Sequence, residues 1–560
     1  MGLIAQAPTV PEALRAGRES SIEQKEWRSL DKPRLLPGSP GNGTSRADLA
    51  TICHSRLGRA IPINSRTTKT VCTAILFTAC LAGIPLALAG PPLAAGDLAL
   101  RHDIQLLADY RIITGPVTTW PIDWRSIEAD IANVGDRESL PLIAEISLKR
   151  VEARMRRRLG RRSPRFSASA SGAENPMAIR GFQDTPREEG ELAAGLSWSN
   201  KRFNIDLNVQ GVDNPDDGKD VRPDGSEIGV NLGNWTLAAS TMQRWWGPGW
   251  DGSLILSNNA RPIPALTLRR SVTKAFESKW LRWIGPWDLR VIWGRMENNR
   301  AVPHPRFFGM KVTFKPHPSL EIGLLRTAIW CGSGRPCGFN TFFDIFTGND
   351  NLGDNNINFQ NEPSDQLAGV DFRWSNTWLG TPMAFYAQVI GEDEAGGLPS
   401  RPLAMAGLEF TGWSQETGWS YRWFAEAAGT SCDFVKSDIF NCAYNHGIYQ
   451  TGYRFRGRAI GHGADNDAFI GSFGLVLVTE RGNELRAIVR SGKLNRGGAP
   501  DPRNTLTPTS LDISSVDLGY AFSIGASRVE IGVGYEQLDD PANIRDDNDV
   551  RGYLQWRFNP

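Results

Sequence analysis

The stretch RFNIDLNVQ at residues 202–210 decides the fold of this chain. Its apolar side chains occupy every second position, at Phe203, Ile205, Leu207 and Val209. The polar side chains fall between them, at Asn204, Asp206 and Asn208. Because successive side chains of a strand point to opposite faces, this alternation predicts a β-strand with one apolar and one polar face.

The same alternation recurs along the chain after residue 162. It is clear in WDLRVIW at 287–293, AGVDFRW at 368–374 and YLQWRF at 553–558, with Ile292 alone out of pattern. β-Sandwiches and propellers also alternate. A membrane barrel is favoured because the polar faces carry charges of both signs and aromatic residues recur near the strand ends. Within a bilayer the sheet must close, so we predict an all-β transmembrane barrel of antiparallel strands over residues 163–560.

Composition excludes two other classes of protein. The 62 basic and 61 acidic residues give a formal net charge of +1, whereas a nucleic-acid-binding protein usually carries a basic excess. The hydrophobic content of 40% is too low for a helical membrane protein. It suits a barrel in which only every second residue of a strand faces lipid.

An export signal is predicted at residues 71–89, VCTAILFTACLAGIPLALA. Basic residues precede this apolar run, and small residues at 87–89 offer a cleavage site, as in secretory signal peptides. A transmembrane anchor is the alternative, which Pro85 disfavours. Residues 1–70 form a leader of doubtful status, and we expect that translation starts further downstream.

Four cysteines follow the signal, and they form two sequence-local pairs, Cys331 with Cys337 and Cys432 with Cys442. An exported chain meets an oxidising compartment, so we predict two loop disulfides. Zinc binding is the alternative, but neither pair has the short spacing of zinc ligands. We predict no metal site and no cofactor; a calcium site among Asp344, Asp350, Asp354 and Glu362 would match no known loop spacing.

Residues 96–162 have a helical period. Asp97 and Asp123 are the predicted caps of two helices, and a third begins near Leu140. One face of the third helix carries six cations: Lys149, Arg150, Arg154, Arg156, Arg157 and Arg158. This face is either solvated or in contact with lipid headgroups or acidic polysaccharide. We predict a periplasmic helical bundle or plug.

The most distinctive segment is QRWWGPGWDGSLILSNNARPIP at 243–264. Two adjacent tryptophans and a third that follows Gly-Pro-Gly can present flat apolar faces to sugar rings, and nearby polar groups can bond hydroxyls or carboxylates. The predicted polysaccharide-binding residues are Arg244, Trp245, Trp246, Trp250, Asp251 and Asn258. A packed turn or an interfacial aromatic belt is the structural alternative.

Catalytic signatures are weak. No Gly-x-Ser-x-Gly motif and no zinc-binding histidine pair occurs, although His462 near Asp465 and Asp467 could assist a hydrolase. The acidic cluster at 391–394 and the basic cluster at 452–458 are interpreted as a polar network in the lumen or a track for charged glycan. We predict no catalytic residues.

Five stretches in order resemble the capsule assembly Wzi family: 243–264, GNDN at 348–351, QLAGVDFR at 366–373, GEDEAG at 391–396, and 452–458 with 461–462. The resemblance covers residues from about 96 to the C-terminus. It implies an eighteen-stranded barrel with an N-terminal α-helical bundle on the periplasmic side. It also implies a lectin-like protein that retains capsular or exopolysaccharide at the surface of a Gram-negative cell.

These implications set the expected partners and location. We expect a protein of the outer membrane, exported by the general secretory route, that contacts outer-membrane lipid and the barrel-assembly machinery. A porin-type channel for small solutes or glycans is the alternative function, and an outer-membrane hydrolase is a third. An open lumen would favour the porin, and a filled one the lectin-like protein.

Overall fold

The computed structural model describes residues 91–560 apart from 136, 160–162, 348–361, 379, 396–397, 435–436, 498, 540–545 and 560. The chain divides into two units, Met1–Leu76 and Phe77–Pro560, and every described residue belongs to the second. The predicted leader and signal segment lie outside the described residues.

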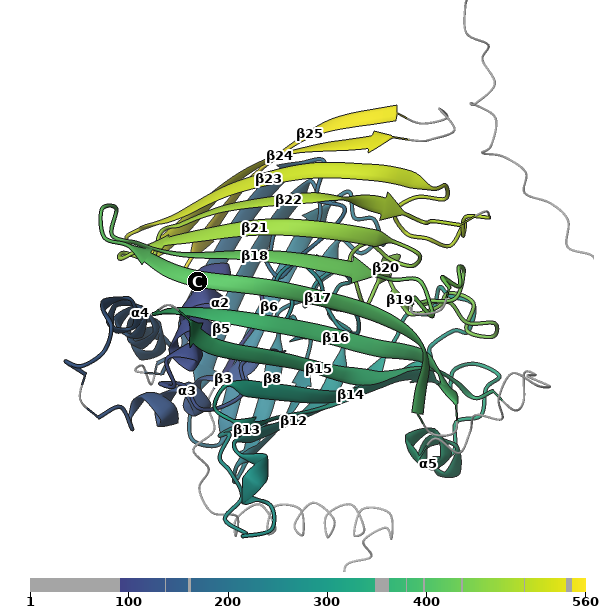
Figure 1. The fold of residues 1–560 in the computed structure, drawn as a ribbon. Coiled ribbons are helices and arrows are strands. Elements are labelled where there is room, and N and C mark those ends of the chain that lie inside the picture. Colours follow the sequence, from purple (N-terminus) through teal and green to yellow (C-terminus); the bar gives the residue numbers. More distant parts are fainter. Residues whose placement is uncertain are drawn as a thin grey trace, which may run out of the picture. The chain divides into compact units, whose positions relative to one another are not determined.

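A closed antiparallel barrel dominates the structure (Figure 1). Eighteen strands complete the ring, and the two-residue β7 pairs beside β6. The strands are β4 (Arg165–Glu174), β5 (Gly190–Ser199), β6 (Phe203–Asp213), β7 (Val221–Arg222), β8 (Glu227–Leu232), β9 (Trp235–Ser240), β11 (Ala265–Arg270), β12 (Trp287–Arg295), β13 (Arg306–His317), β14 (Leu320–Trp330), β15 (Ser364–Trp378), β16 (Thr381–Ala395), β17 (Leu398–Ser414), β18 (Trp419–Gly429), β21 (Phe469–Thr479), β22 (Glu484–Leu494), β23 (Leu511–Ile524), β24 (Ser527–Asp539) and β25 (Asp546–Phe558). The last strand closes on the first, with Phe558 opposite Ala168.

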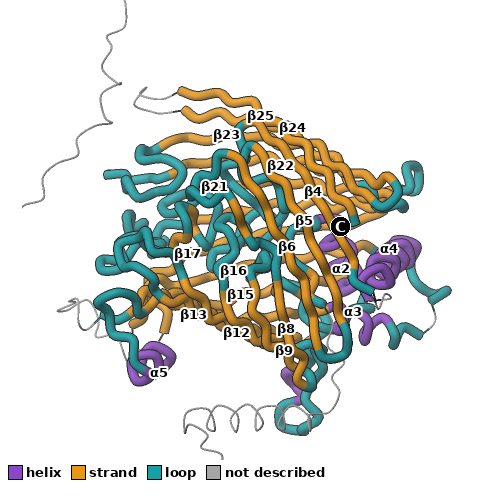
Figure 2. Tube along the Cα trace, turned by 180° about the vertical axis from the view of Figure 1, so that it is seen from behind, coloured by secondary structure: helices purple, strands orange, loops and turns teal. Residues whose placement is uncertain are grey.

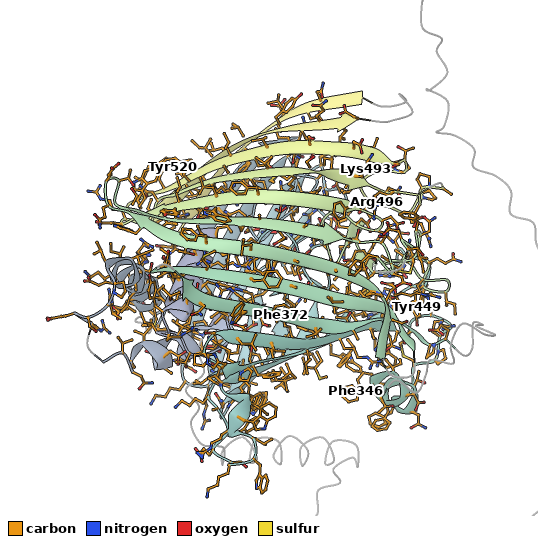
Figure 3. The ribbon with its side chains drawn as sticks, viewed as in Figure 1. Phe346, Phe372, Tyr449, Lys493, Arg496 and Tyr520 are labelled. Carbon is orange, nitrogen blue, oxygen red and sulfur yellow. A yellow bond between two sulfur atoms is a disulfide. The ribbon has the colours of Figure 1, made fainter. Side chains whose placement is uncertain are left out.

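The wall has its apolar face outward. In β6, Asn204 and Asp206 are buried while Leu207 and Val209 are exposed. β15 repeats this arrangement, and Phe372 and Tyr520 lie on the outer wall (Figure 3). Polar side chains inside and apolar side chains outside invert the usual order of a globular protein and are typical of a lipid-facing barrel. The predicted alternation and barrel are confirmed.

Ile292 breaks the alternation because its apolar side chain points inward, into a buried apolar cluster inside the barrel. Its side chain packs in a buried cluster that includes Leu254 and Ile255 of the segment between β9 and β11. The interior of this barrel therefore contains packed apolar groups as well as charges.

Three helices precede the barrel: α2 (Leu98–Asp109), α3 (Trp124–Ile131) and α4 (Leu142–Leu159). Asp97 and Asp123 cap α2 and α3 as predicted, accepting from the backbone N–H groups of Leu100 and Arg125, both at 2.9 Å. Every residue of α2 is buried, because this helix lies against the inward faces of the strands. The shorter elements include the pair β1 (Pro92–Leu93) with β3 (Ile122–Asp123), the pair β19 (Arg454–Phe455) with β20 (Arg458–Ala459), and the 3₁₀-helix η1 (Arg282–Ile284).

The cations of α4 do not form a free surface. Arg150 binds Asp103 of α2, and Arg154 binds Asp97. Arg158 reaches Asp206 inside β6. Lys149 and Arg156 pair with Glu145 and Glu152 on α4 itself. Five of the six cations predicted for solvent or headgroups are thus used in ion pairs within the protein.

The two ends of the barrel differ. Short turns at 200–202, 318–319, 415–418, 480–483 and 525–526 lie at the end near α4, and the chain ends there as well (Figure 1). The described parts of the long connections 175–189, 241–264, 331–363, 430–468 and 495–510 gather at the opposite end, here called the long-loop end, whereas one longer connection, 271–286, lies at the end near α4. Among the described helices, none is both long and apolar enough to span a bilayer.

Candidate functional site

The segment 241–264 folds into the barrel from the long-loop end instead of reaching solvent. Its β10 (Trp245–Trp246) pairs with β2 (Thr119–Trp120) of the N-terminal region. The six side chains predicted to bind polysaccharide are at most 6% exposed: Arg244, Trp245, Trp246, Trp250, Asp251 and Asn258. Their flat and polar faces contact other parts of the protein.

Backbone carbonyls hold the polar members of this set. Arg244 donates to the carbonyl oxygens of Ser240 and Ile263, at 3.0 and 2.9 Å. The Asn258 side-chain amide donates to the carbonyl of Phe182 at 2.7 Å. Since each bond joins different parts of the chain, these side chains fix the path of the buried segment.

Trp250 is enclosed by cations and another aromatic ring. The Arg101 guanidinium of α2 lies 4.2 Å from its ring centroid, and Phe424 stacks on it at 5.8 Å. The indole Nε1 donates to the Glu409 carboxylate at 2.5 Å. Trp250 therefore joins α2, the buried segment and the barrel wall, and its ring has no face open to a sugar.

Asp251 connects the buried segment to the opposite strands. Arg490 of β22 bonds both oxygens of Asp251, at 2.6 and 2.8 Å, and also Asp517 of β23 at 2.6 Å. The next residue must be glycine, because a Cβ at Gly252 would lie 2.3 Å from Nε2 of His462. A charged network of this kind makes the interior rigid when every member is paired.

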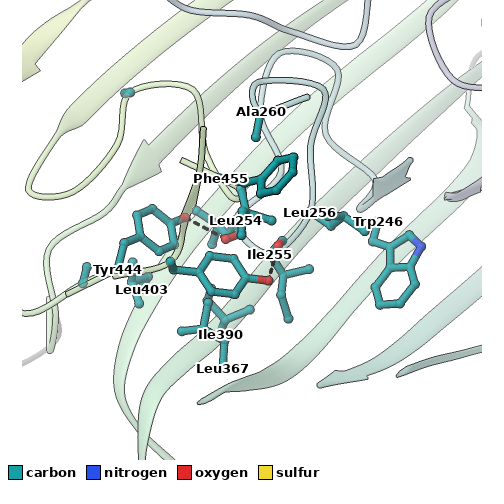
Figure 4. Close-up of a cluster of buried hydrophobic side chains, with 14 of the residues drawn as sticks. Trp246, Leu254, Ile255, Leu256, Ala260, Leu367, Ile390, Leu403, Tyr444 and Phe455 are labelled. Atoms are coloured by element: carbon teal, nitrogen blue, oxygen red, sulfur yellow. Dashed lines mark hydrogen bonds between the residues drawn. The ribbon is translucent and has the colours of Figure 1, made fainter. Parts of the chain in front are cut away.

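The loop 430–468 folds over the same segment. Tyr444 Oη donates to the carbonyl of Leu254 at 2.6 Å, and Tyr453 Oη donates to that of Ile255 at 2.8 Å (Figure 4). Tyr444, Leu254 and Ile255 belong to one buried apolar cluster that the strands enclose. Two long connections thus close the lumen together from the long-loop end.

The basic cluster at 452–458 is satisfied within the loops. Arg454 bonds both oxygens of Asp465, at 2.8 and 3.0 Å, and also Asn466 and Asn445. The side chains of Asp393 and Glu394 lie outside the described residues, so the predicted partnership with the acidic cluster is not visible. The Asp465 carboxylate accepts hydrogen bonds from Arg454 and from Thr505, so it does not assist His462 as the hydrolase hypothesis required.

His462 is buried and neutral. Burial lowers its pKa to about 4, Arg490 acts in the same direction, and Asp251 opposes them. Nδ1 accepts from the backbone N–H of Ala464 at 3.1 Å, which assigns the ring proton to Nε2. This histidine supports the loop, and no serine or carboxylate is described in hydrogen-bonding contact with its side chain.

The exposed surface at the long-loop end carries a patch of different composition. We name the outer patch as Phe434, Asp438, Phe440 and Arg496. Arg496 lies over the Phe440 ring at 5.5 Å and pairs with Asp438 at 3.3 Å (Arg496 is labelled in Figure 3). Phe434 is 44% exposed. An exposed aromatic ring in a loop that also presents a carboxylate paired with a cation can stack on a sugar, and the charged groups can bond its hydroxyls.

Both predicted disulfides are present. Cys331 is bonded to Cys337 and Cys432 to Cys442, with Cα–Cα distances of 4.6 and 5.9 Å. The second disulfide closes the loop that carries Phe434, Asp438 and Phe440. Among the described residues, no group of three or more His, Cys, Asp or Glu side chains is placed to hold a metal ion; Asp350 and Asp354 lie outside the described residues.

The sequence predicted a binding segment but not the outer patch. The six predicted residues do come together, inside the barrel, where they pack instead of facing solvent. The sequence signal for the outer patch is two phenylalanines within a short disulfide-closed loop at the long-loop end.

An outward apolar wall, a polar interior and long loops at one end define a membrane-spanning β-barrel whose lumen is filled from within. Residues 160–549 match the family described as "Capsule assembly protein Wzi", and the chain belongs to this family.

Two relatives extend the comparison. An "Uncharacterized 55.8 kDa protein in cps region" of Klebsiella pneumoniae is 33% identical over 343 residues, 60% of this chain. That match covers 65% of the relative's length. The solved structure of Wzi from Escherichia coli superposes with a TM-score of 0.71 at 24% identity, covering 84% of this chain and 99% of that one. That protein is described as an outer membrane protein involved in group 1 capsule assembly and a carbohydrate-binding β-barrel; the likeness to this chain is one of fold.

Proposed function

We propose that this chain is an outer-membrane protein that holds capsular or extracellular polysaccharide at the cell surface without catalysis. The observation that carries the proposal is a barrel of the capsule assembly family whose lumen is filled beneath its long loops. A filled lumen disfavours the porin-type alternative and leaves the loop surface as the part available to a polymer.

The outer patch is the proposed contact with glycan. Phe434 offers an exposed ring, and Asp438 of the same disulfide-closed loop is paired with Arg496. The buried ion pairs beneath hold the loops in place before binding, which reduces the ordering cost of association.

The buried segment has a supporting role in this account. Direct contact of polysaccharide with Arg244, Trp245, Trp246, Trp250, Asp251 and Asn258 stays a prediction, and their burial favours indirect support of the loops above them. A variant that frees the loops while leaving these residues in place would separate the two roles.

Location and partners follow from the asymmetry of the barrel. Outer-membrane barrels have short periplasmic turns and longer extracellular loops, so the end near α4 is the proposed periplasmic end. There, α2, α3 and α4 would form the periplasmic plug or bundle.

β25 ends in an aromatic residue, Phe558, which fits recognition by the barrel-assembly machinery after export by the secretory route. Outer-membrane lipid would surround the apolar wall.

The test is retention of polysaccharide on cells that produce it. Replacing Phe434 and Arg496 with serine should increase the polysaccharide released to the medium at unchanged levels of barrel in the membrane. Arg481→Ser, an equal loss of charge in the 480–483 turn at the other end, is the matched control and should retain the polymer. Normal retention by the double variant would contradict the outer patch as the contact.

A further inference from the structure

A groove of about 850 Å³ lies on the outer wall of the barrel, away from the outer patch. Its floor includes three outward apolar side chains, Leu207 of β6, Ile228 of β8 and Leu266 of β11. The volume lies within the range of small-molecule sites, roughly 300–1,000 Å³. Elsewhere, outward side chains of this wall serve as a lipid-facing surface, and here they line a hollow.

The hollow has a cause in the sequence. Ile228 pairs across the strands with Ala239, and Ala239 with Leu266. The same row continues to Trp293. The methyl group of Ala239 between the larger side chains of Ile228 and Leu266 leaves a hollow that an inserted acyl chain or a similar apolar group can fill.

Two arginines lie at the long-loop end of the groove. Arg295 of β12 and Arg306 of β13 are directly opposite each other in the register and share the outward face with Trp293 and Phe308. Like charges at directly opposed positions destabilise a strand pair. Among the described residues no carboxylate pairs with either arginine, so within this part of the chain no anion relieves the repulsion.

An aromatic belt places these arginines at the level of lipid headgroups. Trp293, Phe308 and Trp330 pack against Phe342 of α5 (Phe339–Thr347), which lies outside the ring of strands (Figures 1 and 2). Arg306 lies over the rings of Trp293 and Trp330, at 5.8 and 5.5 Å. Aromatic belts mark the membrane interface, and α5 exposes apolar side chains beside it.

We propose that this groove binds a phosphate-bearing, acylated lipid of the outer leaflet, with an acyl chain over Ala239 and a phosphate between Arg295 and Arg306. The proposal rests on the membrane-spanning barrel proposed above and goes beyond general contact with lipid. Charge complementarity selects the ligand, because the ammonium group of a zwitterionic lipid offsets the charge of its phosphate, whereas an anionic lipid brings a net negative charge to the arginine pair.

The experiment measures lipid binding to the full-length protein in mild detergent by native mass spectrometry, with diphosphoryl lipid A and phosphatidylethanolamine as probes. The wild type should bind one lipid A in preference to phosphatidylethanolamine. Each of Arg295→Ser and Arg306→Ser should weaken lipid A binding by about tenfold or more, from the loss of hydrogen bonds between charged groups. Ala239→Phe fills the groove, keeps both charges and should also weaken it.

Lys493→Ser is the control, because Lys493 is an outward cation at the long-loop end of β22 that already pairs with Asp512. Unchanged lipid A binding in the arginine variants, or an equal loss in Lys493→Ser, would overturn the groove. Failure of the wild type to insert into liposomes would instead count against the proposed membrane location, and loss of polysaccharide binding alone would count against the outer patch.

Discussion

At the scale of single residues, the buried side chains of the 241–264 segment decide how the lumen is filled. Trp250 contacts α2, β17 and β18 through Arg101, Glu409 and Phe424. The sequence predicted that these tryptophans face sugar rings, with a packed turn as the alternative, because residue type alone does not tell whether a tryptophan faces a ligand or a core. That difference arises from which loop folds inward, and alternation in the strands carries no information about it.

Trp250→Ala should lower the free energy of unfolding by about 3–5 kcal/mol, because it leaves a cavity and removes one of the two hydrogen bonds that Glu409 Oε2 accepts, the other coming from Arg422. Trp280 is 86% exposed, so Trp280→Ala should change stability by no more than about 0.5 kcal/mol. Thermal unfolding of both variants in detergent checks this, and equal small effects would show that Trp250 is not enclosed.

His462 makes stability depend on pH. Its pKa is about 4 in the folded chain and about 6.5 when unfolded. As the pH falls, His462 is therefore protonated in the unfolded chain before it is protonated in the folded one. The contribution of neutral His462 to the free energy of unfolding is complete above about pH 6.5 and is lost as the pH falls towards 4. The drop in melting temperature between about pH 7.5 and about pH 5 should shrink in His462→Gln; an unchanged drop would assign it to other groups.

At the scale of elements, strands and helix caps were predictable because they depend on local sequence. Asp97 and Asp123 cap helices where expected, and 203–210 lies within β6. The face of α4 was not predictable, because Arg158 finds Asp206 only after the helix packs near β6. The outer patch was missed for a similar reason: its loop meets Arg496, which lies beyond β22, only in the folded barrel.

The disulfide-closed loop 432–442 should depend on its crosslink. A closed loop of this length contributes about 2–4 kcal/mol by restricting the unfolded chain. Replacing Cys432 and Cys442 with serine should therefore speed amide hydrogen exchange in this loop and weaken polysaccharide binding. The matched change of Cys331 and Cys337 should leave exchange at 432–442 unaltered, and an effect equal to that of the first pair would point to general unfolding.

At the scale of the whole molecule, the barrel is a closed wall around a filled lumen. α2 enters from the end with short turns, and the 241–264 and 430–468 segments enter from the other. In planar bilayers the protein should therefore give no large, steady openings. Persistent porin-like conductance of the wild type would contradict a filled lumen.

The central claim is that the long-loop end binds polysaccharide, and the direct measurement is the affinity of the purified full-length barrel for the host's own surface polysaccharides. The account predicts saturable binding by the wild type and by Arg481→Ser, and a loss of at least about tenfold when Phe434 and Arg496 are both serine. Absence of binding to every host polysaccharide, or equal binding by the folded double variant, would contradict it.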